Sequence, residues 1–177
     1  MKIPDILNSS WAILPEKLEI MQDIYLAHMD GRIADASQVT AAVKDKQSQG
    51  TNDDEEKGYT VTAGVAVIPI QGVISRRMNL FSLISGGEST ELLLKKFNTA
   101  LNDPEVEAVL FDTDSPGGAI GGLAPLSDAI YNARGKKPLL AFVGDLMASA
   151  AYWIASSVDH IVAEATSTVG SIGVVTV

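Results

Sequence analysis

The stretch VEAVLFDTDSPGGA, residues 106–119, decides the fold class, because it leads from a strand-like run into a glycine-rich turn. Residues 106–111 form a short apolar run that is typical of a buried strand. In residues 112–119 we expect Ser115, Pro116 and Gly117 to form the turn, since proline fixes φ and glycine permits angles closed to other residues. Residues 121–134, which follow, are predicted to form a helix. The stretch therefore predicts one strand-to-helix unit.

The same alternation continues on both sides of this unit. We expect further strands at residues 64–70, 138–143, 160–163 and 172–177, and further helices at 89–101 and 149–157. Ser89 is placed to cap the first of these helices. Strands that alternate with helices predict βαβ units, so the fold class is α/β with a mainly parallel sheet.

The ends of the chain differ in character from its middle. Residues 1–46 show apolar side chains at helical spacing, which predicts a helical N-terminal extension, and residues 47–60 form a polar, charged linker. The domain proper is then residues 61–177. Because the last predicted strand has no closing element after it, we expect a C-terminally truncated fragment.

Composition excludes several classes of function. The 177 residues carry a net charge of -9 and no clustered basic residues, so a nucleic-acid partner is not expected. The chain has no cysteine and only two histidines, which argues against disulfides, metal sites and a thiol nucleophile. No signal peptide or membrane-spanning stretch is evident, and we expect no cofactor.

Two further segments contain candidate chemistry. In residues 144–152, Ser149 lies among small residues at a predicted strand-to-helix junction. It is either a simple helix N-cap or a nucleophile whose neighbour Ala150 offers its N–H to an oxyanion. Residues 168–174 form a glycine-bracketed turn. Similarly, residues 112–119 are either an ordinary turn or a segment that aims backbone N–H groups at an anion.

These segments, in this order, resemble the S49 peptidase family, which includes signal peptide peptidase A and phage head-maturation proteases. The matching residues are 85–87, 114–118, 148–155 and 170–174. The Ser-Pro-Gly-Gly element is shared with the wider Clp-protease/crotonase fold, which the resemblance implies for this chain. Residues 11–18 resemble the opening of phage and prophage members of the minor capsid protein C type, so the phage subgroup is favoured.

The resemblance implies a serine peptidase with a Ser–Lys dyad. Ser149 would be the nucleophile, the backbone N–H groups of Gly118 and Ala150 would hold the oxyanion, and Ser171 would orient the general-base lysine. In the family that lysine lies well downstream of the nucleophile, and this sequence has no lysine after Lys137. We therefore expect the 177 residues to be catalytically incomplete. A Ser–His arrangement with His160 is a weaker alternative, because its spacing does not fit.

The implied function is processing of phage scaffold, capsid or portal proteins during head assembly, in the host cytoplasm or the procapsid. One alternative is a bacterial signal-peptide-degrading peptidase associated with the membrane. Another is a non-catalytic assembly module that binds procapsid proteins through its N-terminal extension. The resemblance also makes a homo-oligomer plausible, with residues 72–87 as a contact or substrate-binding segment.

Overall fold

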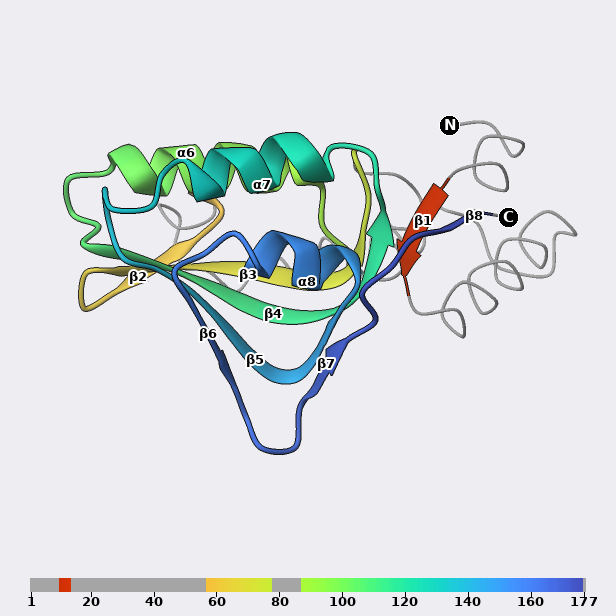
Figure 1. Ribbon diagram of the computed structural model, residues 1–177. Coiled ribbons are helices and arrows are strands. Elements are labelled where there is room, and N and C mark those ends of the chain that lie inside the picture. Colours follow the sequence, from red (N-terminus) through yellow and green to blue (C-terminus); the bar gives the residue numbers. More distant parts are fainter. Residues whose placement is uncertain (1–9, 14–56, 78–86, 177) are drawn as a thin grey trace, which may run out of the picture.

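The computed structural model describes residues 10–13, 57–77 and 87–176 (Figure 1). The strands are β1 (Ser10–Ile13), β2 (Thr60–Thr62), β3 (Val65–Ile74), β4 (Ala108–Ala119), β5 (Leu139–Ala148), β6 (His160–Ala163), β7 (Thr168–Gly170) and β8 (Val175–Thr176). The helices are α6 (Thr90–Asn102), α7 (Leu123–Tyr131) and α8 (Ala150–Ala155). None of the helices in these ranges is long and apolar enough to cross a bilayer.

All eight strands belong to one sheet whose centre is parallel. Strands β3, β4 and β5 run parallel to one another, and β5 pairs in parallel with β6 along its first half and with β7 along its second. Strand β2 folds back on β3, and β1 runs antiparallel between β4 and β8. Helix α6 connects β3 to β4 and α7 connects β4 to β5, so the predicted α/β class with βαβ units is confirmed.

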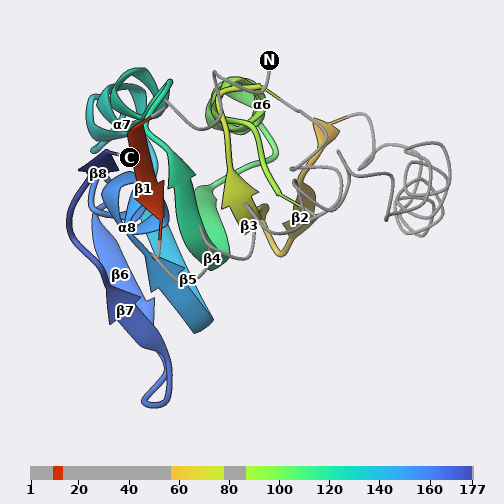
Figure 2. The same cartoon turned by 90° about the vertical axis from the view of Figure 1, so that its right-hand side faces the viewer.

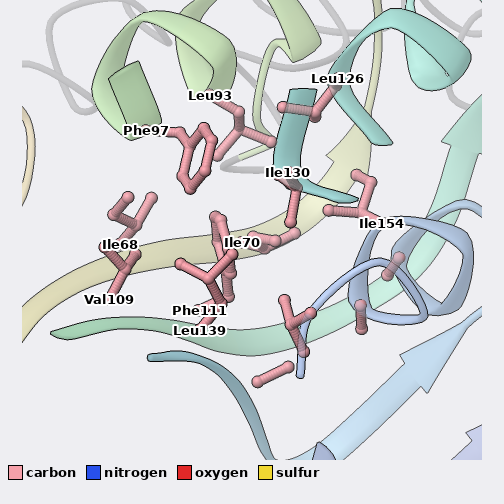
Figure 3. Packing of buried hydrophobic residues seen from close by; sticks show 14 of the residues in the cluster. Ile68, Ile70, Leu93, Phe97, Val109, Phe111, Leu126, Ile130, Leu139 and Ile154 are labelled. Atoms are coloured by element: carbon pink, nitrogen blue, oxygen red, sulfur yellow. The ribbon is translucent and has the colours of Figure 1, made fainter. Parts of the chain in front are cut away.

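The three helices cover one face of the sheet (Figure 1). Their apolar side chains point down onto the alternate residues of β3, β4 and β5 that face them (Figure 3). Phe97 of α6 lies over Phe111 of β4 with ring centroids 5.9 Å apart. In β3 the alternation is regular, with Ala66, Ile68 and Ile70 fully buried on the helix side. This period of two is what fixes the register of the sheet against its helices.

Local sequence explains where these elements begin. Ser89 has extended backbone angles and accepts a hydrogen bond from the N–H of Leu92, so the predicted N-cap is confirmed. Helix α7 begins after Gly122, whose left-handed φ of 87° glycine adopts without strain. The predicted strand at residues 160–163 also agrees with the structure.

Two strands extend further than their sequences suggested. Residues 112–119, expected as a turn formed by Ser115, Pro116 and Gly117, continue β4 to Ala119, so the turn prediction is wrong. The cause is pairing to β3, which skips register opposite Gly72 and creates a bulge. Pro116 falls in that bulge, where a missing N–H costs no ladder bond. Strand β5 likewise runs on to Ala148, and α8 is shorter than predicted.

The N-terminal extension is also corrected in part. A helical extension was expected over residues 1–46, but Ser10–Ile13 is a strand of the main sheet. The remaining residues of that range, and most of the linker expected at 47–60, lie outside the described residues. The last linker residues already belong to the domain, because Tyr59 is buried in the core and Thr60 begins β2.

Candidate active site

The three sequence segments singled out above meet at one edge of the sheet. Parallel strands β3, β4 and β5 all end there, which is where ligands bind in open α/β sheets. Gly117 and Gly118 lie at the end of β4, Ser149 follows β5, and residues 170–173 follow β7. The segments lie close together because the parallel strands that carry them end at the same edge of the sheet. Their order along the chain does not predict this.

Ser149 occupies a strained junction between β5 and α8. Its φ of 54° and ψ of -108° lie outside the regions that L-residues prefer, at a cost of about 1–3 kcal/mol. Its carbonyl accepts the N–H of Trp153 at 2.8 Å, which starts the helix, while its own N–H donates to Gly170 at 2.9 Å. Ser149 does occupy the N-cap position of α8, but its side chain accepts no helix N–H, so it does not act as a cap. Strain without a capping bond is typical of a functional position.

The segment after β7 wraps around this serine. The Ser149 hydroxyl donates to the carbonyl oxygen of Gly173 at 3.1 Å, and only 6% of the residue is exposed. Between these two contacts lies Ser171, which is exposed and has a left-handed φ of 53°. Residues 170–173 therefore hold both the backbone and the hydroxyl of Ser149, and they place Ser171 in the same loop.

On β4, the buried side chain of Ser115 holds the backbone of Gly117, next to Gly118, in place. Ser115 is fully buried, donates its hydroxyl to the carbonyl of Gly72 at 2.6 Å and accepts the N–H of Gly117 at 3.2 Å. Gly117 has a φ of 99°, and a Cβ on Gly118 would lie 1.8 Å from the carbonyl oxygen of Ile74. Only glycine fits at Gly118, because the obstacle is backbone and cannot rotate away.

Ala150 begins α8 directly after the strained serine and is fully buried. The first N–H groups of a helix have no acceptor within the helix, and the Ala150 N–H donates to no other residue in the described part of the chain. The residue's methyl group leaves little bulk next to the hydroxyl. A backbone N–H beside a hydroxyl group is able to donate to an oxyanion.

The described residues bring no proton acceptor to Ser149. The partner of its hydroxyl is a carbonyl, which is not a base. His160 is exposed and pairs with Leu140 near the start of β5, about 30 Å of strand before the nucleophile, so the Ser–His alternative is wrong. The described residues also hold no group of three or more side chains suited to a metal ion.

Two of the lysines in the described residues have structural partners. Lys137 donates to the carbonyls of Ala100 and Asp103, so it binds the C-terminus of α6 rather than that of its own preceding helix. Lys96 is buried and forms an ion pair with Glu88 at 3.0 Å. Burial raises the pKa of Glu88, against the opposing effect of the Lys96 charge.

Sequence reasoning missed two parts of this site. One is the Gly173 carbonyl, which no side-chain pattern could reveal. The other is β1, in which Trp11–Ile13 pair with Gly117–Ala119 (Figure 2). A signal for that strand was present, since Pro15 disfavours helical angles at the residue before it and the run ahead of it is short and apolar.

Comparison with known proteins agrees with the sequence resemblance. The model of peptidase family S49 matches residues 132–177, which include Ser149, Ala150 and Ser171. The chain is 36% identical over 116 residues to the head-tail preconnector protein GP5 of Enterobacteria phage P21, covering 66% of this chain and 23% of that protein. It is 32% identical over 120 residues to the capsid assembly protease C of Escherichia phage lambda, covering 68% and 27%.

More distant relatives are found outside phages. The chain is 31% identical over 128 residues to Protease 4 of Haemophilus influenzae, covering 70% of this chain and 20% of that protein. A solved enoyl-CoA hydratase/isomerase family member aligns with a TM-score of 0.44 and 18% identity, covering 59% of this chain and 46% of the other. The chain spans about a quarter of the length of the phage relatives. The chain is therefore similar to S49 peptidases, and the model of that family matches residues 132–177.

Proposed function

We propose that this chain carries the nucleophile of a serine endopeptidase, and that the nucleophile is Ser149. The observation that supports this most strongly is the backbone of Ser149, which is held at a strained φ by the Gly170 carbonyl at the end of the parallel strands. Such strain persists only where surrounding structure enforces it. The family match over residues 132–177 supports the same role.

In the proposed reaction the Ser149 hydroxyl attacks the scissile carbonyl carbon. The serine proton passes to a general base, the C–N bond breaks with protonation of the leaving amine, and water then hydrolyses the acyl-enzyme. The N–H groups of Gly118 and Ala150 receive the oxyanion. The loss of one such donor costs about 2.7–4 kcal/mol in barrier height.

The proposed general base is a lysine, oriented by Ser171, as the resemblance to the family implies. Residues 1–177 contain no lysine after Lys137, and Lys57, Lys96 and Lys137 bind other partners. We therefore infer that these residues alone are catalytically incomplete. A lysine serves as a base only when burial or a neighbouring positive charge lowers its pKa.

The proposed substrates are proteins of the phage head: scaffold, capsid or portal proteins, cut in the host cytoplasm or inside the procapsid by a homo-oligomer. The names of the two phage relatives, a capsid assembly protease and a head-tail preconnector protein, support this choice of substrate class.

Co-expression tests the proposal. The protein encoded by the whole gene is produced together with the capsid and scaffold proteins encoded beside it, as the parent and as Ser149→Ala. Ser156→Ala is the matched control, because Ser156 ends the same helix and its hydroxyl contacts only the Trp153 carbonyl among the described residues. Cleavage products that vanish in Ser149→Ala alone support the peptidase. Products unaffected by Ser149→Ala refute it, and binding without cleavage in all three favours the assembly module.

A further inference from the structure

The strand beside the proposed oxyanion glycine comes from the opposite end of the chain. Strand β1 pairs Trp11 with Ala119, Ala12 with Gly118 and Ile13 with Gly117. On its other edge, Ser10 pairs with Thr176 and Trp11 with Val175 of β8. A four-residue segment is thus inserted between two strands of the site, as Figure 2 shows for β1 beside β4 and β8.

This position exists because β5 leaves the sheet at Ser149. Strand β3 accompanies β4 along one edge as far as Gly118. The other edge of β4 pairs with β5 only as far as Ser115, opposite Met147. From Gly117 onward that same edge pairs with β1. Between the end of β4 and β8 there is therefore a slot one strand wide, which an extended peptide fills by completing the backbone ladder on both sides.

Strand β1 runs through the slot in the direction that the acyl side of a bound substrate would take. Strand β1 runs from the level of Ala119 at Trp11 to the level of Gly117 at Ile13. The last pair between β4 and β5 is Ser115 with Met147, two residues before Gly117 on β4 and two residues before Ser149 on β5. The carboxyl end of β1 thus arrives at the level of the nucleophile. A substrate whose acyl side replaced β1, with its scissile carbonyl towards Ser149, would run in this direction.

We propose that the slot between β4 and β8 binds extended peptides, and that residues 10–13 occupy it as an intramolecular competitor. This inference rests on the proposed function, because the slot is a substrate-binding site only if Ser149 is the nucleophile of a peptidase. A substrate that pairs with Gly117–Ala119 has to displace β1 first, since both need the same backbone groups. A competitor on the same chain acts at a high effective concentration. It therefore excludes peptides that bind weakly and is displaced only by peptides that bind tightly.

The first experiment asks whether β1 occupies the slot in solution. The chain has no cysteine, so Trp11→Cys with Ala119→Cys introduces a single cross-strand pair, whose Cβ atoms should lie about 4.5–5.5 Å apart. The control pairs Trp11→Cys with Ala108→Cys, at the other end of β4. We expect mild oxidation to cross-link the first pair within the monomer and not the control. Equal or absent cross-linking in the two overturns the proposal.

The second experiment asks whether β1 and a free peptide compete. The probe is a fluorescein-labelled peptide with the sequence of residues 6–17, followed by fluorescence anisotropy. We expect Ala12→Pro, which removes a ladder N–H from β1, to bind the probe with a Kd at least about tenfold lower than the parent chain does. A probe with proline at the same position is the control and should bind neither protein. Equal Kd values for parent and Ala12→Pro overturn the proposal.

Should Ala12→Pro fail to fold by circular dichroism, the cysteine pair decides the question. The reduced Trp11→Cys/Ala119→Cys chain is expected to bind the probe with a Kd at least about tenfold lower than its oxidised form, in which β1 is locked in place. Equal binding by the two forms overturns the proposal. All binding variants also carry Ser149→Ala, so these outcomes are independent of cleavage, and a failure here is distinguishable from a failure of the peptidase proposal.

Discussion

Substituting Gly118 by alanine tests both the packing of β4 and the integrity of the site. A Cβ at this position would lie 1.8 Å from the carbonyl oxygen of Ile74, whereas real Cβ atoms essentially never approach other atoms within 3.0 Å. Strands β3 and β4 must therefore separate locally by more than about an ångström, the scale that ordinary van der Waals contact demands. No side-chain rotation relieves the clash, because the obstacle is backbone.

The expected cost follows from this geometry. Overpacking in a core costs about 1–3 kcal/mol, and a clash with immovable backbone belongs at the upper end, near 3 kcal/mol. With an m-value of about 1–3 kcal/mol/M, the urea midpoint should fall by about 1–3 M. A displacement of about 1 Å beside the reacting atoms also costs about a hundredfold in rate.

The assay is urea unfolding followed by circular dichroism, with two glycine controls. Gly144→Ala places its Cβ 3.6 Å from the Phe142 ring, an ordinary contact, and should lose no stability. Gly135→Ala meets nothing within 4 Å but has a φ of +82°, so it measures backbone strain alone, about 1–2 kcal/mol. If Gly118→Ala lowers the midpoint no more than Gly135→Ala does, the reasoning about Gly118 is refuted.

Three further predictions concern polar groups. Ser115→Ala should destabilise the fold by about 1–3 kcal/mol in urea unfolding, because it leaves two buried backbone groups without their partner. The hydrogen bond from Lys57 lowers the pKa of Asp103 below its ordinary 3.8. The stability that this ion pair gives the fold is therefore present above pH 3.8 and is lost as pH falls through the lowered pKa. The stability gap between parent and Asp103→Asn, measured by thermal unfolding, should therefore close at acid pH; a gap independent of pH contradicts this. Lys96→Met should cost about 3–5 kcal/mol and adding Glu88→Leu should recover most of it in a double-mutant cycle, whereas additive losses contradict a buried pair.

The sequence predicted the α/β fold well because its strands and helices carry clear periodicity. The alternation in β3 and the Ser89 cap of α6 are local signals that survive folding unchanged. The extent of β4 was not predictable, since Pro116 and Gly117 indicate a turn by composition. Their strand conformation depends on a bulge opposite Gly72, which is a tertiary contact.

The candidate site residues were proposed from the sequence alone, but their geometry could not be. Ser149 was found through neighbouring residue types, while its strained φ and its bond to the Gly173 carbonyl depend on a segment that follows β7. Strand β1 was mistaken for helix because its pairing partners lie more than a hundred residues away along the chain. Local propensity is routinely overridden by such distant pairing.

Covalent labelling of Ser149 tests the central claim most directly. A fluorophosphonate probe is added to the protein encoded by the whole gene and to residues 1–177, and the modified residue is located by tandem mass spectrometry. We predict that the label lies on Ser149 in the whole protein, disappears in Ser149→Ala, remains in Ser156→Ala, and is weak or absent in residues 1–177. A label on a different serine, or labelling that survives Ser149→Ala, would contradict the assignment of the nucleophile; strong labelling of residues 1–177 would contradict the inferred need for a further lysine.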